Sequence, residues 1–286
     1  MNVIGFDTSN YTTSIACFDG VGGANCSQLL PVKQGQLGLR QSDALFAHVK
    51  SLPELSGRLF SNVATSSIAA VGVSTRPRAV EGSYMPCFLA GIAQAKLLSD
   101  ALHVPLFEVS HQQGHVAAAL WSADRMDLMD RAHLAWHLSG GTTDISAGQL
   151  IDRTGQLLQL PFPSGKHLDA LSAEAVDTAV FKVKCPGLEF SLSGVQNKVE
   201  NYHKSAASDA ETAAYALRCV AQAVRTATVN ALKEYPGLEV VFSGGVASNS
   251  MLRQKLADLK PVFAQPQYST DNAMGVAILA HRMIEG

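Results

Sequence analysis

The first 110 residues alternate between short apolar runs and polar turns. "VIGF" (3–6) and "SIACF" (14–18) predict two strands joined by a polar turn, so the N-terminus is expected to form a hairpin. "IAAVGVST" (68–75) predicts a third strand, and an Ala-rich helix is expected near residues 86–102. "VPLFEVS" (104–110) predicts a further strand. Strands that alternate with helices indicate an α/β fold.

The second part of the chain repeats this theme with glycine-rich turns. "AHLAWH" (132–137) predicts a strand that ends in the polar turn "LSGGTTDIS", and "LEVVF" (238–242) predicts a buried strand followed by a Gly-Gly turn and a helix. Further helical patterns lie near residues 144–160, 167–178 and 208–234.

The recurrence predicts two related α/β lobes with a cleft between them. The N-terminal lobe is expected to comprise residues 1–108, with a C-terminal helix over residues 271–286 packing back on it. The C-terminal lobe is expected to comprise residues 109–270. The polar turn "STDN" (269–272) opens the C-terminal helix.

Composition narrows the class of protein. The 286 residues are 47% hydrophobic and 16% charged, with a net charge of −2, so no global feature indicates nucleic acid, and RNA contact needs a local basic patch or a partner. No apolar run reaches the length of a membrane span, and the N-terminus does not resemble a secretory signal. The five scattered cysteines form no C-x-x-C. This pattern predicts reduced thiols and a cytoplasmic protein without membrane contact.

Three turns follow predicted strands and carry small residues with free backbone N–H groups. They span residues 7–10, 139–143 and 243–246, and the last precedes a helix. Consecutive glycines permit a close approach of backbone N–H groups to an anion, and a helix N-terminus favours negative charge. A single such turn is more typical of a plain tight turn, but three turns of small residues across two lobes indicate phosphate binding.

A histidine pair raises a separate question. His111 and His115 in "SHQQGH" lie one helical turn apart and would point the same way, as two ligands of a metal or as two imidazoles that share a face. Ser110 and Gln113 also have the spacing of a helix-capping box, which would place His111 at the first helical position for no chemical reason. The pair alone leaves both interpretations open.

The order of these motifs resembles the actin/Hsp70/sugar-kinase (ASKHA) superfamily, an α/β fold of two RNase H-like lobes. Within it, "GFDTSNYTTSIA", "HQQGH", "HLSGGTTD", "GQLIDR", "LPFPSGKHLDALS", "FSLSGVQNKV", "SGGVASNSMLRQKL" and "STDNAMG" occur in the order found in the tRNA threonylcarbamoyladenosine synthesis transferase family, formerly labelled O-sialoglycoprotein endopeptidase. The resemblance covers nearly the whole chain.

The resemblance implies a site residue by residue. His111, His115 and Asp271 match the family's metal-binding positions. The positions expected to bind the nucleotide-bearing substrate are Leu138, Ser139, Gly140, Gly141, Thr142, Asp152, Gly165 and Asn249, together with Gly244, Gly245 and Asp7 of the turns. Two histidines and one carboxylate suit Zn²⁺ or Fe²⁺ with coordination positions left open. Asp271 has an alternative interpretation as the N-cap of the C-terminal helix.

The resemblance also implies an activity. A threonylcarbamoyl group would pass from threonylcarbamoyl-AMP to N6 of adenosine in tRNA, and the expected small-molecule partner is threonylcarbamoyl-AMP or another adenine nucleotide. One divalent metal ion (Fe or Zn) and an AMP- or ATP-type nucleotide are the expected cofactor and substrate. Partner protein subunits are expected on the N-terminal lobe.

Two departures from the family pattern keep other functions open. Gln113 stands where the family usually has Glu, and the link from Thr143 to Asp152 is short, so the chain resembles a shorter paralogous branch. One alternative is a catalytically inactive paralogue that binds nucleotide and a partner protein. Another is an ATP-dependent kinase or ATPase that uses Asp7 and Asp144. A peptidase is the weakest candidate, because there is no H-E-x-x-H motif.

One further histidine, His48 in "DALFAHVKSLPEL", lies on a predicted amphipathic helix. This position predicts that its side chain points to solvent or to a lobe interface.

Overall fold

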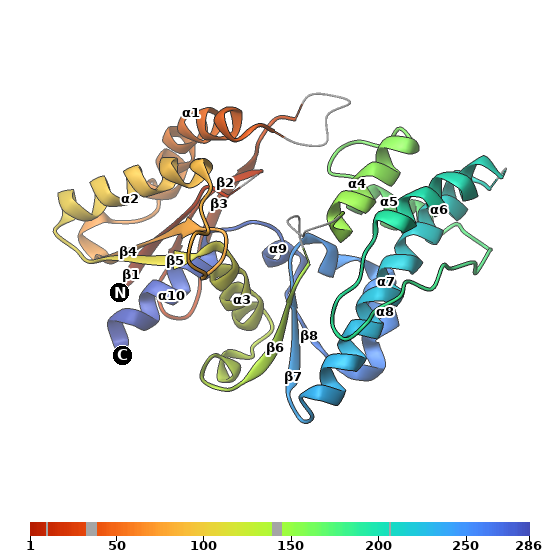
Figure 1. Ribbon diagram of the computed structural model, residues 1–286. Helices are drawn as coiled ribbons and strands as arrows, with labels where there is room; N and C mark the ends of the chain where they lie inside the picture. The colour runs from red at the N-terminus through yellow and green to blue at the C-terminus, as the bar shows by residue number, and fades with distance from the viewer. Residues whose placement is uncertain (10, 33–38, 139–144, 206) are drawn as a thin grey trace. The chain divides into compact units, whose positions relative to one another are not determined.

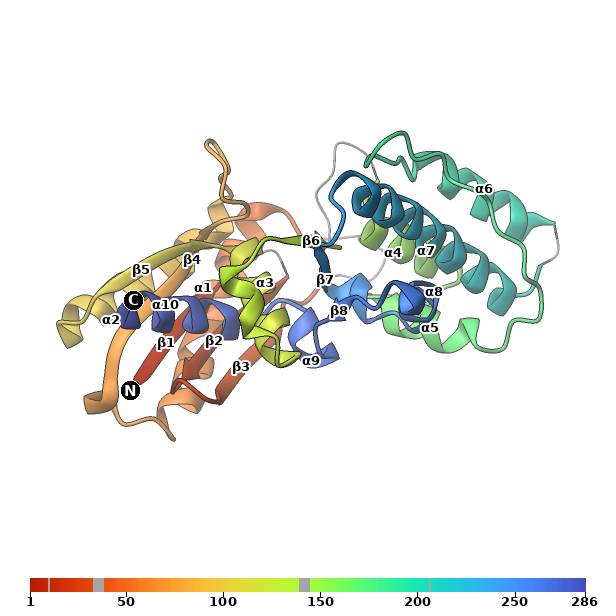
Figure 2. The ribbon, with the colours of Figure 1, turned by 90° about the horizontal axis from the view of Figure 1, so that it is seen from below.

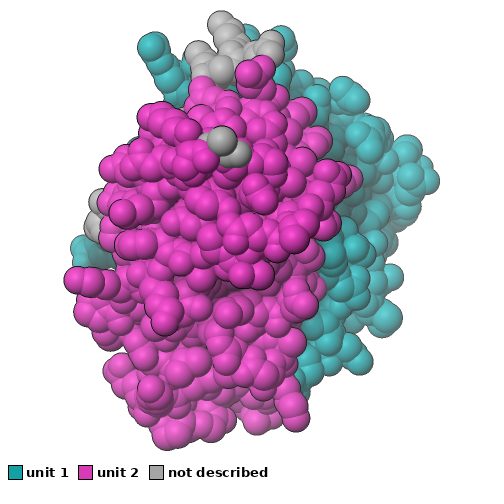
Figure 3. Space-filling view, turned by 90° about the vertical axis from the view of Figure 1, so that its right-hand side faces the viewer, with its two compact units in different colours: residues 1–129, 264–286 teal, residues 130–263 magenta. Residues whose placement is uncertain are grey.

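A computed structural model of the chain describes residues 1–9, 11–32, 39–138, 145–205 and 207–286. Contacts group these residues into two compact units, which Figure 3 shows in different colours. The first unit is Met1–Met129 with Ala264–Gly286, and the second is Asp130–Phe263. The predicted boundaries at 108/109 and 270/271 differ from this division, because helix α3 (His111–Ser122) and residues 264–270 belong to the first unit.

The first unit is built on a five-stranded sheet with the order β3-β2-β1-β4-β5. β1 pairs antiparallel with β2 and parallel with β4, so the predicted N-terminal hairpin is present. Sequence analysis missed β3, because its mostly polar, exposed residues lie at an edge of the sheet and lack an apolar run. The strands are β1 (Asn2–Asp7), β2 (Thr12–Phe18), β3 (Gly23–Leu29), β4 (Ile68–Arg76) and β5 (Leu106–Ser110).

Helices cover both faces of this sheet (Figures 1 and 2). α1 (Gln41–Phe60) and α2 (Leu89–Leu102) pack on the face that carries Ile4, Phe6 and Val73. On the other face lie α10 (Met274–Glu285) and α3, with the short helix α9 (Pro266–Ser269) beside α3. β1, β2 and β4 therefore bury both sets of their alternating side chains, as the apolar runs of β1 and β4 require.

The prediction for His48 is wrong. Its side chain is fully buried on the inner face of α1, where Nδ1 lies 2.8 Å from Oγ1 of Thr13 on β2. Burial lowers the pKa of this imidazole to about 4. The neutral imidazole is therefore part of the core, and its Nδ1 is satisfied by the hydrogen bond with Thr13.

Helix α10 packs closely against α3 and the sheet at positions that carry glycine. A Cβ atom built on Gly275 would lie 1.8 Å from the Gly114 carbonyl oxygen of α3, and one built on Gly5 of β1 would lie 2.6 Å from the Ala273 carbonyl oxygen. The obstructing atoms in both cases belong to the backbone, so neither contact can be relieved by a side-chain rotation. This close packing brings α3 against the segment that precedes α10.

Replacement of Gly275 by alanine is expected to destabilise the first unit by about 1–3 kcal/mol or more, because overpacking here forces two helices apart. The matched control is Gly57→Ala in α1, where an added Cβ meets no atom within 4 Å and the variant is expected to gain up to about 1 kcal/mol. Urea unfolding of both variants measures the difference. An unchanged midpoint for Gly275→Ala would contradict the packing described here.

The second unit has a three-stranded parallel sheet with the order β6-β7-β8. Its core surrounds the long helix α7, which the sequence pattern predicted almost to the residue. The predicted helices at 144–160 and 167–178 are shorter than expected, and α6 was not predicted. The strands are β6 (His133–His137), β7 (Glu239–Ser243) and β8 (Val262–Phe263), and the helices are α4 (Ala147–Leu157), α5 (Gly165–Ser172), α6 (Ser193–Lys204), α7 (Asp209–Glu234) and α8 (Ser250–Leu256).

The parallel order β6-β7-β8 repeats the order β1-β4-β5 of the first sheet. Over the described part of the second unit, no strand corresponds to the hairpin partners β2 and β3. The short link between β6 and α4 that the sequence indicated accounts for this difference. None of the helices in the described ranges combines the length and apolar character needed to cross a membrane.

Candidate functional site

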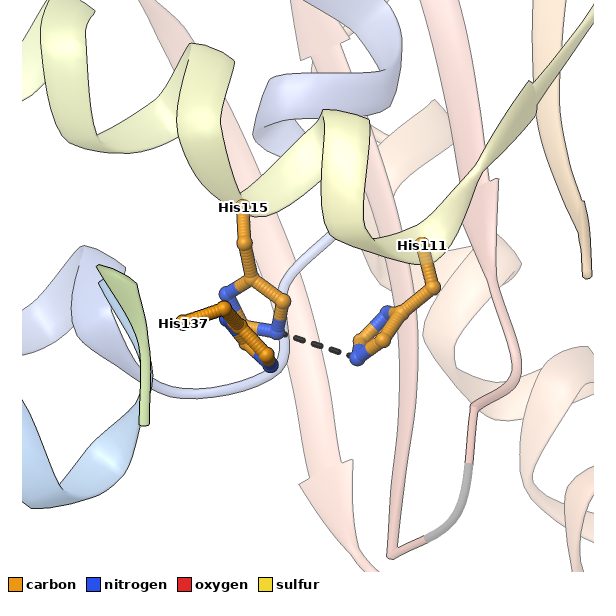
Figure 4. Close-up of side chains that lie close together, drawn as sticks. All are labelled: His111, His115 and His137. Atoms are coloured by element: carbon orange, nitrogen blue, oxygen red, sulfur yellow. Dashed lines mark hydrogen bonds between the residues drawn. The ribbon is translucent and has the colours of Figure 1, made fainter. Parts of the chain in front are cut away.

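The two histidines lie at the start of α3, directly after β5. Ser110 caps the helix: its Oγ accepts a hydrogen bond from the Gln113 backbone N–H, and Gln113 Oε1 accepts one from the Ser110 N–H. The predicted capping box is therefore present, and Gln113 is engaged in capping at the position where the family carries Glu. The cap fixes His111 at the first helical position, and His115 follows one turn later on the same face. The two rings therefore lie side by side in a T-shaped arrangement, with centroids 4.4 Å apart (Figure 4).

Three atoms from these residues and Asp271 converge within the first unit. His111 Nε2 lies 3.0 Å from His115 Nε2. Asp271 Oδ1 lies 3.5 Å from His111 Nε2 and 3.3 Å from His115 Nε2. The structure thus brings together all three residues of the predicted metal-binding set, although 156 positions separate His115 from Asp271.

The alternative interpretation of Asp271 as a helix cap is wrong. α10 begins at Met274, three residues later than predicted. The Met274 N–H donates a hydrogen bond to Asn272 Oδ1. The carboxylate of Asp271 instead faces the two imidazoles.

Asp7, at the end of β1, belongs to the same cluster. Its Oδ2 lies 2.7 Å from His111 Nδ1, and its Oδ1 accepts a hydrogen bond from the Ser9 backbone N–H. The carboxylate is 1% exposed. Asp7 was expected beside the nucleotide, whereas its contact in the structure is the ring of a candidate metal ligand. No local pattern in the sequence could reveal a contact between residues 104 positions apart.

The charges of the cluster are strongly coupled. Burial opposes the cationic form of His111, but the Asp7 carboxylate outweighs it and, with Asp271, raises the pKa of His111 to about 9. Burial also opposes the charged form of Asp7, but attraction to His111 holds the pKa of Asp7 below its usual value. Burial and the neighbouring His111 lower the pKa of His115.

The donor set fits a divalent metal ion. Nitrogen and oxygen ligands lie about 2.1 Å from Zn²⁺, so two ligands separated by 90–110° at the metal lie roughly 3.0–3.4 Å apart. Two of the three distances between His111, His115 and Asp271, 3.0 and 3.3 Å, lie within this spacing, and the third, 3.5 Å, is slightly longer. Two imidazoles and one carboxylate are a typical set for Fe²⁺ and Zn²⁺ sites with open positions. Asp7 has the place of the carboxylate that commonly holds the second nitrogen of a metal-binding histidine.

In the second unit, Leu138 after β6 and the turn after β7 meet at the carboxyl edge of the sheet. The Leu138 N–H donates to the Ser243 carbonyl oxygen. Gly244 has φ of +91°, and a Cβ there would lie 2.5 Å from the Leu138 carbonyl oxygen, so the position requires glycine. Gly245 begins a 3₁₀ turn that ends at Ser248. Ligands of α/β proteins commonly bind at this edge of a parallel sheet.

The remaining predicted substrate residues lie on the helices of the second unit. Asp152 on α4 accepts a hydrogen bond from the Ser164 N–H through Oδ1, and Gly165 follows as the first residue of α5. Burial raises the pKa of Asp152. Asn249 caps α8 and donates to Asp169 Oδ1 on α5.

Asp169 connects these elements and was not identified from the sequence. It also accepts hydrogen bonds from the backbone N–H and the hydroxyl of Ser250. An acidic residue inside a helical pattern gives no signal of such a role.

Several predicted residues lie outside the described part of the chain. These are Ser139, Gly140, Gly141 and Thr142 of the second glycine-rich turn, together with Asp144 of the kinase alternative and Asn10 of the first turn.

A separate pocket of about 540 Å³ opens between α7, α8 and residues 178–180. It contains none of the predicted site residues. Arg225, one of its basic side chains, is paired with Asp258 at 2.5 and 2.8 Å. Its lining residues are Thr178, Val180, Arg218, Ala221, Gln222, Arg225, Met251, Gln254, Lys255 and Asp258.

Comparison with known protein families gives a match over most of the chain. Residues 42–278 match the family described as TsaD, tRNA N6-adenosine threonylcarbamoyltransferase. A protein of that name from Carboxydothermus hydrogenoformans is 32% identical over 266 residues, with 84% of this chain and 78% of the relative covered. One from Streptococcus equi subsp. zooepidemicus is 32% identical over 242 residues, with 75% and 70% covered.

Solved structures with the same fold are more distant in sequence. HypF of T. kodakarensis has a TM-score of 0.61 at 13% identity and covers 100% of this chain and 48% of its own. (R)-2-Hydroxyglutaryl-CoA dehydratase component A of Acidaminococcus fermentans has a TM-score of 0.58 at 15% identity and covers 100% of both chains. Together with the two α/β sheets, these similarities confirm the predicted ASKHA fold class.

Proposed function

We infer the activity from one premise: this chain belongs to the tRNA N6-adenosine threonylcarbamoyltransferase family. We propose that it transfers a threonylcarbamoyl group from threonylcarbamoyl-AMP to N6 of adenosine in tRNA. N6 forms a bond to the carbamoyl carbon, the bond from that carbon to the phosphate oxygen breaks, and AMP leaves. N6 gives up one proton in the process.

The convergence of His111, His115 and Asp271 carries this proposal. These residues would hold Fe²⁺ or Zn²⁺, and Asp7 would orient His111 through Nδ1. When bound, the ion supplies Lewis-acid polarisation of a carbonyl oxygen of the threonylcarbamoyl group. The side chains of Asp7 and His115 are 2% exposed, and those of His111 and Asp271 are 12% and 22% exposed, so the charges of the cluster are largely shielded from water.

We assign the AMP moiety of the donor to the second unit. The backbone of Leu138, Gly244 and Gly245 lines the carboxyl edge of the sheet, where N–H groups suit a phosphate. Asp152, Gly165 and Asn249 are the proposed contacts of the nucleoside, and residues 139–142 complete the predicted set. Rigid placement of the donor would supply much of the rate acceleration.

A partner protein on the first unit also remains part of the proposal. Phe46 and Val49 of α1 and Leu97 of α2 are 66%, 54% and 66% exposed. Exposed apolar side chains gathered on two neighbouring helices favour a protein contact.

Transfer is best tested where natural partners are present. A lysate from a strain that lacks this chain is supplied with unmodified tRNA and threonylcarbamoyl-AMP, with and without the purified chain, and the modified nucleoside is measured by mass spectrometry. The expected result is formation of N6-threonylcarbamoyladenosine only when the chain is added. Unchanged tRNA together with retained AMP binding would favour the inactive nucleotide-binding paralogue.

A further inference from the structure

The segment that carries Asp271 is held by the strands of the first sheet. The Ala273 backbone N–H donates to Ser14 Oγ on β2 at 2.8 Å and to Asn25 Oδ1 on β3 at 3.2 Å. Ser14 Oγ in turn donates to Asn25 Oδ1 at 2.8 Å. Ser14 and Ala273 are fully buried, so these hydrogen bonds are shielded from competition with water.

These contacts act beside the Asn272 side chain, which accepts from the Met274 N–H, at the start of α10. Its N-cap residue is Ala273, which has no side-chain oxygen, and the helix has no side-chain cap of its own at this position. Ser14 and Asn25 provide acceptors for the Ala273 N–H from the sheet. Asn272 shapes the turn from within, because its side chain bonds the carbonyl oxygens of Tyr268 and Thr270. The shape of the turn is therefore set locally, and its position is set by β2 and β3.

The register of the sheet connects this contact to the histidines. Ser14 lies directly opposite Asp7 in the β1–β2 ladder, and directly opposed residues of antiparallel strands project from the same face. Asn25 lies opposite Ala16, two residues further along β2, and hence on that face too. Asp7 contacts His111, while Ser14 and Asn25 hold the backbone two residues beyond Asp271. Residues on one face of the sheet thus contact both His111 and the segment that carries Asp271.

We propose that Ser14 and Asn25 are positioning residues that keep Asp271 at ligand distance from His111 and His115. This inference rests on the metal centre of the proposed function. The contact with Ala273 explains why position 14 carries a hydroxyl. On the same face of the sheet, Gly5 and Ala16 are small residues that pack near α10 and bring no polar group that needs a partner.

Loss of both acceptors would leave the first turn of α10 free to shift, and with it Asp271. Residues that orient metal ligands typically contribute 10–100-fold to metal affinity. We expect Ser14→Ala/Asn25→Ala to weaken Zn²⁺ binding by about this factor. Asn25→Asp retains both acceptor contacts and is expected to bind within roughly threefold of the wild type, since the affected interaction is preserved.

The experiment titrates the full-length chain with Zn²⁺ against a competing chelator and records the absorption spectrum of the Co²⁺-substituted protein, which reports ligand geometry. Wild type, Ser14→Ala, Asn25→Leu, Asn25→Asp and the double variant are compared. Ser99→Ala is the matched control. It removes a buried serine hydroxyl on α2 that donates to the Val104 carbonyl oxygen. Circular dichroism verifies folding of each variant.

The outcomes separate the two proposals. Weaker Zn²⁺ binding and an altered Co²⁺ spectrum in the double variant, with the wild-type pattern in Asn25→Asp and Ser99→Ala, would support the positioning role. Wild-type affinity and spectrum in the double variant would overturn it. A wild-type chain that binds neither ion would refute the metal centre of the proposed function itself. If the double variant fails to fold, the single variants at the half-buried Asn25 provide the test. Equal Zn²⁺ affinity of Asn25→Leu and Asn25→Asp would then overturn the inference.

Discussion

A chain in which His111 and His115 are both replaced by alanine is expected to be purified without bound divalent metal and to lose threonylcarbamoyl transfer. The two imidazoles supply two of the three converging donor atoms, and Asp271 alone would remain. Structural zinc sites with four ligands contribute roughly 10–16 kcal/mol of binding free energy, so the loss of two ligands should weaken binding by a factor on the order of 10⁴ or more.

Elemental analysis of protein purified without chelator and without an affinity-tag metal measures this loss. Near-stoichiometric Fe or Zn is expected in the wild type and none in the double variant. The matched control is His133→Ala/His203→Ala, which removes two imidazoles from the second unit and should leave the metal content unchanged. Metal retained by the His111/His115 variant would show that the ion is held elsewhere, and no metal in the wild type would assign the pair a structural role.

The local part of this site was predictable from the sequence. A capped helix fixes the direction of side chains one turn apart, so the spacing of His111 and His115, with Ser110 and Gln113, already specified the pair. The strands β1, β2 and β4 and the helix α7 followed for the same reason, because each has a clear apolar period of its own.

What depends on distant contacts was not predictable in this way. Asp7 reaches His111 only because β1 and the start of α3 are neighbours in the folded unit, and the roles of Ser14 and Asn25 depend on strand register. His48 was misplaced because the helical pattern does not show that Thr13 offers a polar partner inside the core. The start of α10 was misplaced because its N-cap residue, Ala273, is bound by side chains of the sheet, which leave no local signal.

Metal affinity is expected to rise about 50-fold between pH 7 and pH 9 and to level off above that range. Asp7 raises the pKa of His111 to about 9, so in the metal-free protein this ring is cationic at pH 7, with Nδ1 donating to Asp7 and Nε2 donating to His115. A metal ion that takes Nε2 must displace its proton. The free-energy cost of removing this proton falls as the pH rises toward the pKa of His111, and each pH unit corresponds to a tenfold gain in metal affinity. The lowered pKa of His115 leaves that ring neutral, so it adds no slope.

Asp7→Asn separates this effect from other causes of pH dependence. Without the carboxylate, burial is the largest influence on His111 and acts to lower its pKa, so the slope between pH 7 and pH 9 should largely disappear. The variant also loses the negative charge behind the ligand, which should weaken binding at pH 9 by about 10–100-fold. The wild type should therefore bind more tightly than the variant at pH 9, and this advantage should disappear or reverse at pH 7. Chelator-buffered Zn²⁺ titrations at pH 7, 8 and 9 measure both slopes, and calorimetry in two buffers of different ionisation enthalpy counts the released proton. Parallel curves for the two proteins would show that Asp7 does not control the protonation of His111, and that the pair is held together by packing alone.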